Sequence, residues 1–182
     1  MGRFTASTFK DLFMGKKTAG YEKAILTPVH ERFTGERPDS YYGYHMRRGH
    51  EMEPFTVEEY ERQNFVEVKP GGFFALGEWI GASPDGLIGD DGLLEGKSPA
   101  WNTVIKYILS GTLPDEYFWQ VHGQLYVTDR AWCDFTVYHP DFDLLVLRVE
   151  RDEEIEKRLV EELDAAITKA SDILETLRGK AA

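Results

Sequence analysis

The chain contains the stretch Ser83-Pro84-Asp85-Gly86-Leu87-Ile88-Gly89-Asp90-Asp91-Gly92-Leu93-Leu94-Glu95-Gly96-Lys97, in which charged residues flank a short turn. The pairs Leu87-Ile88 and Leu93-Leu94 are typical of strands, and the Gly and Asp residues between them are typical of tight reversals. We therefore predict a hairpin. Glu95 and Lys97 are two residues apart, so on a strand both side chains point to the same face.

This hairpin carries groups that suit a hard divalent cation beside a phosphate. The carboxylates of Asp85 and Glu95 are ligands that Mg²⁺ or Mn²⁺ prefers, and the ammonium of Lys97 can orient or deprotonate water and offset charge on a phosphate. Because the pattern is short, a surface hairpin with a solvated Glu95 and Lys97 is the alternative interpretation. Other segments bear on this choice.

Two parts of the hairpin, Pro84-Asp85 and Glu95-Gly96-Lys97, resemble the signature of the PD-(D/E)xK nucleases. Upstream, residues 49–61 resemble the G-x-x-x-E-P-x-A-x-x-x-Y-E helix of the lambda-exonuclease or YqaJ-type phage recombination exonucleases. Only Thr56 departs from that helix, since the family usually has Ala there.

Two further segments resemble the same family. Residues 119–127 are similar to its Q-V-Q helix, with His122 in place of the second Gln, and Phe4-Thr5-Ala6-Ser7 is similar to its I-T-A-S helix opening. The matches run in the expected order from about residue 2 to the final strands. The resemblance implies an α/β fold with a restriction-endonuclease-like core, a mixed central β-sheet flanked by helices, as a single domain over residues 1–182.

The resemblance also implies roles for individual residues. Asp85, Glu95 and the carbonyl of Gly96 ligate Mg²⁺, for which Mn²⁺ can substitute, and Glu53 completes the acidic cluster. Lys97 holds the attacking water and lowers the pKa of that water. The reaction is in-line displacement at phosphorus.

Phosphate contacts are implied at positions outside the acidic cluster. Ser7, Ser83 and Gln120 match positions that hold the terminal phosphate or the scissile region, although Ser7 also suits a helix N-cap. The family's phosphate-pocket arginine matches a position just before Gly2, and Arg3 is out of register with it. His122 either contacts DNA or packs in the interior.

The composition fits a compact enzyme. The chain has 182 residues, of which 42% are hydrophobic, so it can bury one sizeable core. The lone Cys133 excludes an intrachain disulfide and a four-cysteine metal site made by one chain. His45 and His50 are five residues apart, which argues against a zinc site with Glu51 and Glu53. No apolar run reaches the length of a membrane span, and we expect a cytoplasmic protein without a membrane partner.

The net charge of −11 is unfavourable for a protein that approaches DNA. Local basic residues would have to supply the DNA track, and the candidates are Lys10, Lys16, Lys17, Arg37, Arg47, Arg48 and Lys106. An exposed tryptophan among Trp79, Trp101, Trp119 and Trp132 could stack against a separated base.

The sequence also predicts the order of the elements. We expect a helix from an N-cap at Ser7, an irregular segment over 24–39, and a helix over 41–61 with a kink or break at Pro54. Strands are expected over 65–69, 73–82, 87–88, 93–97, 132–138 and 144–149. Further helices are expected over 103–109 and 116–127, and the periodic residues from Ile155 to Leu177 predict a long final helix.

The resemblance implies a 5′→3′ exonuclease that resects linear duplex DNA ends to leave 3′ single strands for phage-type recombination. It further implies a homotrimeric ring and a single-strand annealing protein as a partner. One alternative is a PD-(D/E)xK endonuclease or repair nuclease without end dependence. Another is an acidic interaction protein or DNA mimic, which has no need of Asp85, Glu95 and Lys97 together.

Overall fold

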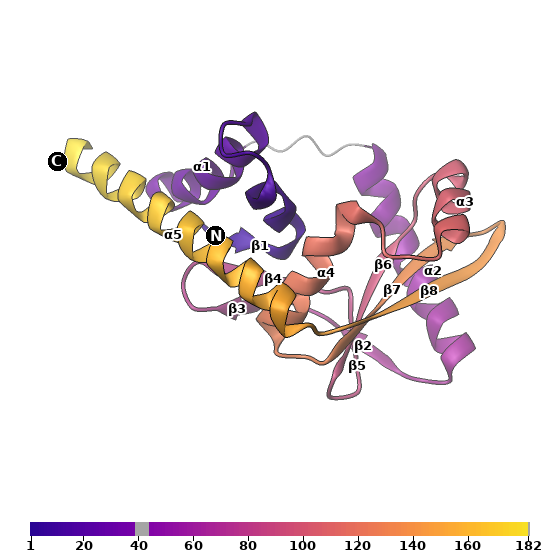
Figure 1. Ribbon diagram of the computed structural model, residues 1–182. Helices are drawn as coiled ribbons and strands as arrows, with labels where there is room; N and C mark the ends of the chain where they lie inside the picture. Colours follow the sequence, from indigo (N-terminus) through magenta and orange to yellow (C-terminus); the bar gives the residue numbers. More distant parts are fainter. Residues whose placement is uncertain (39–43, 182) are drawn as a thin grey trace.

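The computed structural model describes residues 1–38 and 44–181, and the side chains of 44–50 and 181 lie outside the described set (Figure 1). Its elements in chain order are β1 (Phe4–Thr5), the 3-10 helix η1 (Ala6–Phe13), α1 (Ala19–Thr34), α2 (Tyr44–Asn64), β2 (Val68–Pro70), β3 (Phe74–Leu76), β4 (Ile80–Ala82), β5 (Gly86–Ile88), β6 (Gly92–Lys97), α3 (Trp101–Ser110), α4 (Asp115–Thr128), β7 (Trp132–His139), β8 (Phe142–Glu150) and α5 (Glu153–Ala181).

A five-stranded mixed sheet forms the centre of the molecule, in the order β2-β5-β6-β7-β8. Strands β6 and β7 are parallel, with Glu95 opposite Phe135, and the other neighbours are antiparallel. A second sheet has the order β1-β4-β3. The α/β fold with a mixed sheet flanked by helices is therefore as the sequence predicts.

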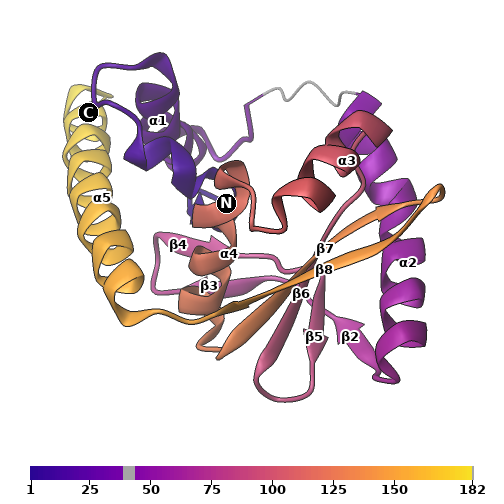
Figure 2. The same cartoon turned by 45° about the vertical axis from the view of Figure 1, so that its right-hand side comes forward.

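Helices α4 and α2 lie on opposite faces of the central sheet (Figure 2). The side chains of β6 alternate between these faces and contribute to a core on each. Leu93 packs with Val121 and Leu125 of α4 on one face. The next residue, Leu94, packs with Tyr60 of α2 on the other face. Glu95 and Lys97 therefore share the α4 side with Leu93, whereas Gly96 faces α2.

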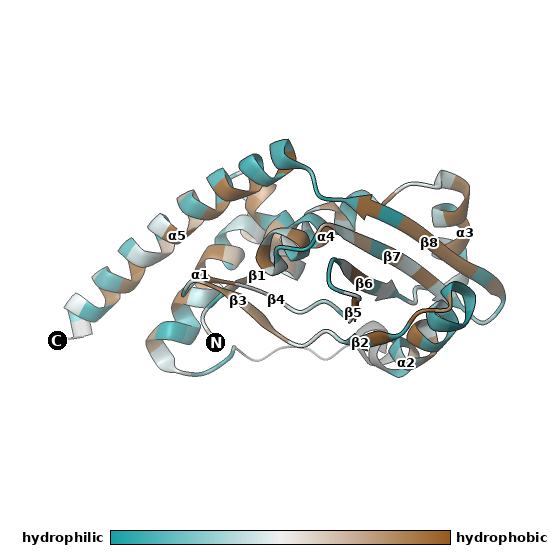
Figure 3. Cartoon of the chain, turned by 90° about the horizontal axis from the view of Figure 1, so that it is seen from below, coloured by the Kyte–Doolittle hydropathy of each residue, from teal (hydrophilic) through white to brown (hydrophobic). Residues whose placement is uncertain are grey.

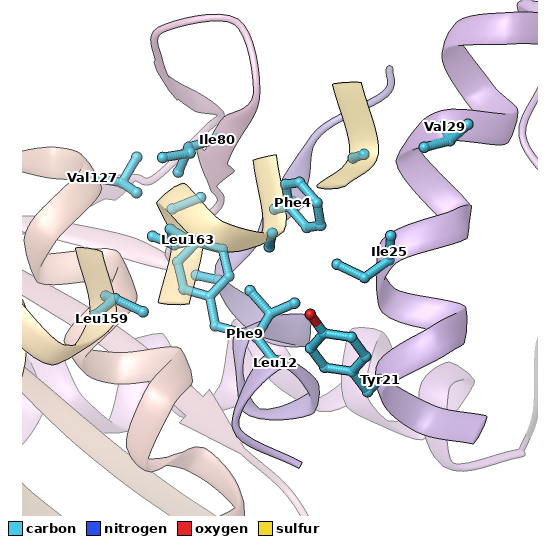
Figure 4. Packing of buried hydrophobic residues seen from close by; sticks show 14 of the residues in the cluster. Phe4, Phe9, Leu12, Tyr21, Ile25, Val29, Ile80, Val127, Leu159 and Leu163 are labelled. Atoms are coloured by element: carbon cyan, nitrogen blue, oxygen red, sulfur yellow. The ribbon is translucent and has the colours of Figure 1, made fainter. Parts of the chain in front are cut away.

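A third core joins η1, α1 and α5 to the small sheet (Figure 4). Phe9 of η1, Ile25 of α1 and Leu163 of α5 are fully buried in it. Apolar and polar residues alternate along α5 at helical spacing, as the bands of colour along that helix show (Figure 3). The predicted stripe of the long final helix is thus mainly core packing.

The predicted irregular segment over 24–39 is wrong for 24–34, because α1 runs to Thr34 through Pro28, while 35–38 are irregular as predicted and residue 39 lies outside the described set. Pro28 lacks the N–H for one helical hydrogen bond. The helix persists because Tyr21, Ile25, Pro28 and Val29 repeat at helical spacing and are buried. Its ends are also well formed, since the hydroxyl of Thr18 accepts the N–H of Tyr21 at 3.3 Å and Gly35 is left-handed with φ 78°.

Three smaller predictions about elements also need correction. Helix α2 is not broken at Pro54 and extends to Asn64, while residues 41–43 of the predicted helix lie outside the described set. The predicted strand over 73–82 is two strands, which turn at a left-handed Gly77. Finally, Thr5 is the N-cap residue of η1, so Ser7 lies within its first turn.

Candidate active site

The predicted hairpin is present as β5 and β6, with Ile88 paired to Gly92. Its turn begins at Gly89, which has a φ of 54° that favours glycine. Asp85 stands just before β5, and its Oδ2 accepts the backbone N–H of Gly96 at 2.8 Å. The hairpin therefore fixes Asp85 against the strand that carries Glu95 and Lys97.

The carboxylate of Glu95 is the most completely held group of this cluster, with 1% of the residue exposed. Its Oε1 accepts hydrogen bonds from the Lys97 ammonium and, at 2.5 Å, from the Gln120 amide. Its Oε2 accepts the Gln124 amide at 2.6 Å. These donors offset the large cost of burying a carboxylate and fix the orientation of Glu95.

Gln124 is a site residue that the sequence analysis did not single out. It is four residues after Gln120, so both side chains lie on one face of α4. The spacing of the two glutamines is the sequence signal for this role, although the family's Q-V-Q pattern places its second glutamine at His122. The Gln124 amide also reaches the Ser83 carbonyl at 3.5 Å, which links α4 to the residue before Pro84-Asp85.

Burial and mutual repulsion set the charge state of the cluster. Burial raises the pKa of Asp85 to about 7, and the negative charges of Glu95 and Glu53 add to this effect against the opposing ammonium of Lys97. For Lys97, burial alone would lower the pKa, but the carboxylates of Glu95 and Asp85 outweigh it and raise the pKa above its ordinary value. Lys97 is therefore a cation, whereas Asp85 titrates near neutrality.

Helix α2 supplies the other side of the cluster. Thr56 is buried and lies so close to Gly96 that a Cβ on Gly96 would stand 3.0 Å from the Thr56 methyl group. Glu53 lies one turn earlier on the same face of α2. Its negative charge contributes to the raised pKa of Asp85. An unbroken α2 therefore directs Glu53 toward Asp85 without the predicted break.

The residues of the cluster suit a hard divalent cation by their charge and oxygen atoms, but they do not yet form a complete ligand set. Asp85, Glu95 and Glu53 bring more negative charge to this region than Lys97 offsets, and carboxylate oxygens suit Mg²⁺. Within residues 1–38 and 44–181, however, no three acidic, His or Cys side chains already surround one point. Asp85 and Glu95 are therefore close enough to interact electrostatically, and Glu53 is close enough to affect Asp85.

Three predicted phosphate ligands make their described contacts with groups other than Glu95. The Arg3 guanidinium donates to the carbonyls of Gly77 at 2.6 Å and Ile80 at 3.0 Å, so it ties down the β3–β4 turn. His122 is buried and packs against the Phe118 ring at 4.5 Å, and burial lowers its pKa. Ser7 is exposed on η1, with its hydroxyl 3.3 Å from that of Thr5.

The predicted DNA track is exposed wherever it is described. Lys10, Lys16, Lys17, Arg37 and Lys106 all have exposed side chains, while those of Arg47 and Arg48 lie outside the described set. His45 and His50 lie outside it as well.

The sequence of the chain matches a known protein family. Residues 1–131 match the model of the YqaJ-like viral recombinase domain, so the match covers more than half of the chain. The chain belongs to this family. The matched part of this YqaJ-like protein includes the hairpin with Asp85, Glu95 and Lys97 and both glutamines of α4.

Solved structures agree with this assignment. The chain is similar to the alkaline exonuclease LHK-Exo from Laribacter hongkongensis, with 31% identity and a TM-score of 0.91 over 99% of this chain and 93% of that one. The complex of LHK-Exo with dAMP gives 32% identity, the same TM-score and the same coverage. A phage-related exonuclease from Haemophilus somnus 129PT shares the fold, with 14% identity, a TM-score of 0.68, and coverage of 99% and 96%.

No curated protein matches the chain. Among the described residues, no helix is long and apolar enough to cross a membrane.

Proposed function

We propose that this YqaJ-like protein is a Mg²⁺-dependent exonuclease that degrades linear duplex DNA from its 5′ ends and leaves 3′ single strands. The observation that carries the proposal is the cluster in which Lys97, Gln120 and Gln124 hold the buried carboxylate of Glu95 beside Asp85. Membership of a viral recombinase family and the likeness to an alkaline exonuclease support the same activity.

Each residue of the cluster has a distinct task in this proposal. Asp85 and Glu95, with the Gly96 carbonyl and Glu53, would hold Mg²⁺, and Mn²⁺ would substitute. A bound divalent ion supplies Lewis-acid stabilisation of the phosphate oxygens. Lys97 orients the attacking water and offsets charge at phosphorus, while Gln120 and Gln124 keep Glu95 in place. Ser7, Ser83 and Arg3 remain candidates for contacts to DNA, whereas the buried His122 packs against Phe118.

Duplex DNA labelled at either the 5′ or the 3′ end tests the end dependence and the polarity. We expect early release of 5′ label as mononucleotide, late loss of 3′ label, and no cleavage of closed circular duplex. Cleavage of the circle at a comparable rate would instead support an endonuclease or repair nuclease. A protein that binds DNA or a nuclease and cleaves neither substrate would be the acidic interaction protein.

The proposal extends to assembly and partners through the family. A homotrimeric ring would enclose the duplex, and a single-strand annealing protein would receive the 3′ strand. A cytoplasmic location is consistent with a DNA substrate.

A further inference from the structure

Helix α3 follows the catalytic strand directly and exposes a large apolar surface. Trp101 begins α3 four residues after Lys97, so the two Cα atoms are within about 14 Å of each other. The α3 apolar face, as we call it, consists of Trp101, Ile105, Ile108 and Leu109, which are 60%, 37%, 41% and 80% exposed. These positions recur at helical spacing, so they form one continuous strip.

This face is separate from the side of α3 that packs on the sheet. Val104 is fully buried, and Val104 and Tyr107 pack with the core beneath α3. The residues of the α3 apolar face are not among those that form this core. A contiguous strip of exposed apolar side chains is typical of a binding site, whereas single exposed apolar residues are common on any protein surface.

Trp101 differs from the other three tryptophans in its surroundings. Trp119 is stacked on Phe13 with ring centroids 3.4 Å apart. Guanidinium groups cover Trp79 and Trp132, each with its carbon 3.7 Å from the ring centroid. These three indoles are engaged by protein groups, whereas Trp101 presents most of its surface to solvent.

Helix α3 itself carries no carboxylate, which favours a polyanion as the occupant of its exposed face; Glu116 accepts the Tyr107 hydroxyl on the core side of the helix. Residues 96–114 contain no Asp or Glu, and this is the longest such run in a chain of net charge −11. Lys97 and Lys106 are the charged residues within it. An exposed aromatic ring in an acid-free segment combines the two features by which proteins hold single-stranded nucleic acid, since bases stack on the ring and phosphates lie near the cations.

We propose that Trp101 is a base-stacking residue that holds an unpaired nucleotide of the DNA strand next to the catalytic cluster. This inference rests on the proposed function, because it assigns the strand being cleaved as the occupant. Stacking is independent of net charge, so it supplies affinity where an acidic protein gains little from phosphate attraction. Lys106 would contribute a phosphate contact on the neighbouring side of α3.

Binding without metal tests this proposal apart from catalysis. The probes are a single-stranded oligonucleotide and an abasic strand of the same length, titrated in EDTA. We expect the intact chain to prefer the strand with bases, and Trp101→Ala to lose that preference with about tenfold or more weaker binding. Trp101→Phe should retain most of it. Leu26→Ala, which removes an exposed aliphatic residue of α1 outside the α3 apolar face, should bind like the wild type.

Kinetics give a second readout if the chain digests linear duplex. We expect Trp101→Ala to raise KM while kcat at saturating DNA stays within about twofold, because the indole binds substrate and does not touch the reacting atoms. Equal affinity of wild type and Trp101→Ala for both strands would overturn the stacking role. The stacking role would also be overturned if Trp101→Ala and Leu109→Ala both changed the sedimentation mass and left DNA binding unchanged. The α3 apolar face would then contact a second copy of the chain. An inactive chain that still shows the Trp101-dependent preference would contradict the nuclease activity alone.

Discussion

Lys97 combines two properties that a catalytic cation needs, a fixed position and a stable charge. Its ammonium donates to Glu95 Oε1, and the neighbouring carboxylates raise its pKa even though burial opposes this. The ammonium lies 5.2 Å from the Tyr117 ring centroid, a cation–π contact on its other side. A cation held in this way costs little reorganisation when negative charge develops at phosphorus.

We therefore predict that Lys97→Ala lowers kcat by about 10²–10³, or about 3–4 kcal/mol, which is typical of the loss of one preorganised electrostatic group. Folding should be largely retained, because Gln120 and Gln124 still hold Glu95. The measurement is single-turnover digestion of linear duplex, with circular dichroism as the check on folding. Lys69→Ala, an exposed lysine of the same sheet, is the matched control. Wild-type rates from Lys97→Ala would exclude the assigned role.

The titration of Asp85 predicts how metal binding depends on pH. Its pKa of about 7 in the folded, metal-free protein means that the carboxyl must lose a proton before it can ligate a cation. The affinity for Mg²⁺ should rise about tenfold between pH 6 and pH 8 and then level off. Calorimetry at several pH values measures this, and an affinity that is constant over the range would contradict it.

The raised pKa of Asp85 also predicts how the free energy of unfolding changes with pH. Its pKa is higher in the folded protein than in the unfolded chain, where it is about 4. The folded state therefore binds the proton more tightly, and this contribution to the free energy of unfolding falls as pH rises from about 4 to 7. In the absence of metal, Asp85→Asn should remove this part of the pH dependence in urea denaturation. A pH profile unchanged by the substitution would show that Asp85 titrates normally.

At the scale of elements, the close packing of α2 on β6 explains the glycine in Glu95-Gly96-Lys97. A Cβ at position 96 would stand 3.0 Å from the Thr56 methyl group, so the buried Thr56 would have to move by a few tenths of an ångström. We predict that Gly96→Ala lowers the free energy of unfolding by about 1–3 kcal/mol.

Combining this change with Thr56→Ala makes the prediction specific. The smaller residue leaves room for the new methyl group, so Gly96→Ala should cost clearly less in that background than in the wild type. Thermal and urea unfolding of the four proteins in this cycle give the interaction energy. Strictly additive effects would show that contact with Thr56 does not limit position 96.

The sequence predicted the elements that follow simple periodicity and missed those where two signals conflict. The hairpin at Asp85 and Glu95 and the long helix α5 have clear patterns and few breakers. Helix α1 is not predicted from the sequence, because Pro28 is a helix breaker and the burial of the apolar residues around it is known only from the structure. Gln124 was missed because its contact with Glu95 depends on how α4 lies over β6, which local sequence does not specify.

At the scale of the whole molecule, the charge of −11 means that a single chain would retain DNA weakly between cuts. A closed ring would hold the strand by enclosing it and would need only a modestly basic lining. We predict a trimer, with a mass in sedimentation of three times the 20.9 kDa chain. Digestion should then continue after a trap of unlabelled DNA is added. A monomer that stops at once on meeting the trap would instead indicate a distributive nuclease.

The most direct test of the central claim, that the Asp85 and Glu95 cluster is a metal-dependent nuclease site, is nucleotide release from linear duplex as Mg²⁺ is titrated. We expect release by the wild type to rise with Mg²⁺, to stop in excess EDTA, and to return when Mg²⁺ is restored. Asp85→Asn keeps the size of the side chain but lacks its charge, so it should fold, bind Mg²⁺ far more weakly and release little nucleotide at any concentration. Undiminished release in EDTA, or release by Asp85→Asn at the wild-type rate, would contradict the claim.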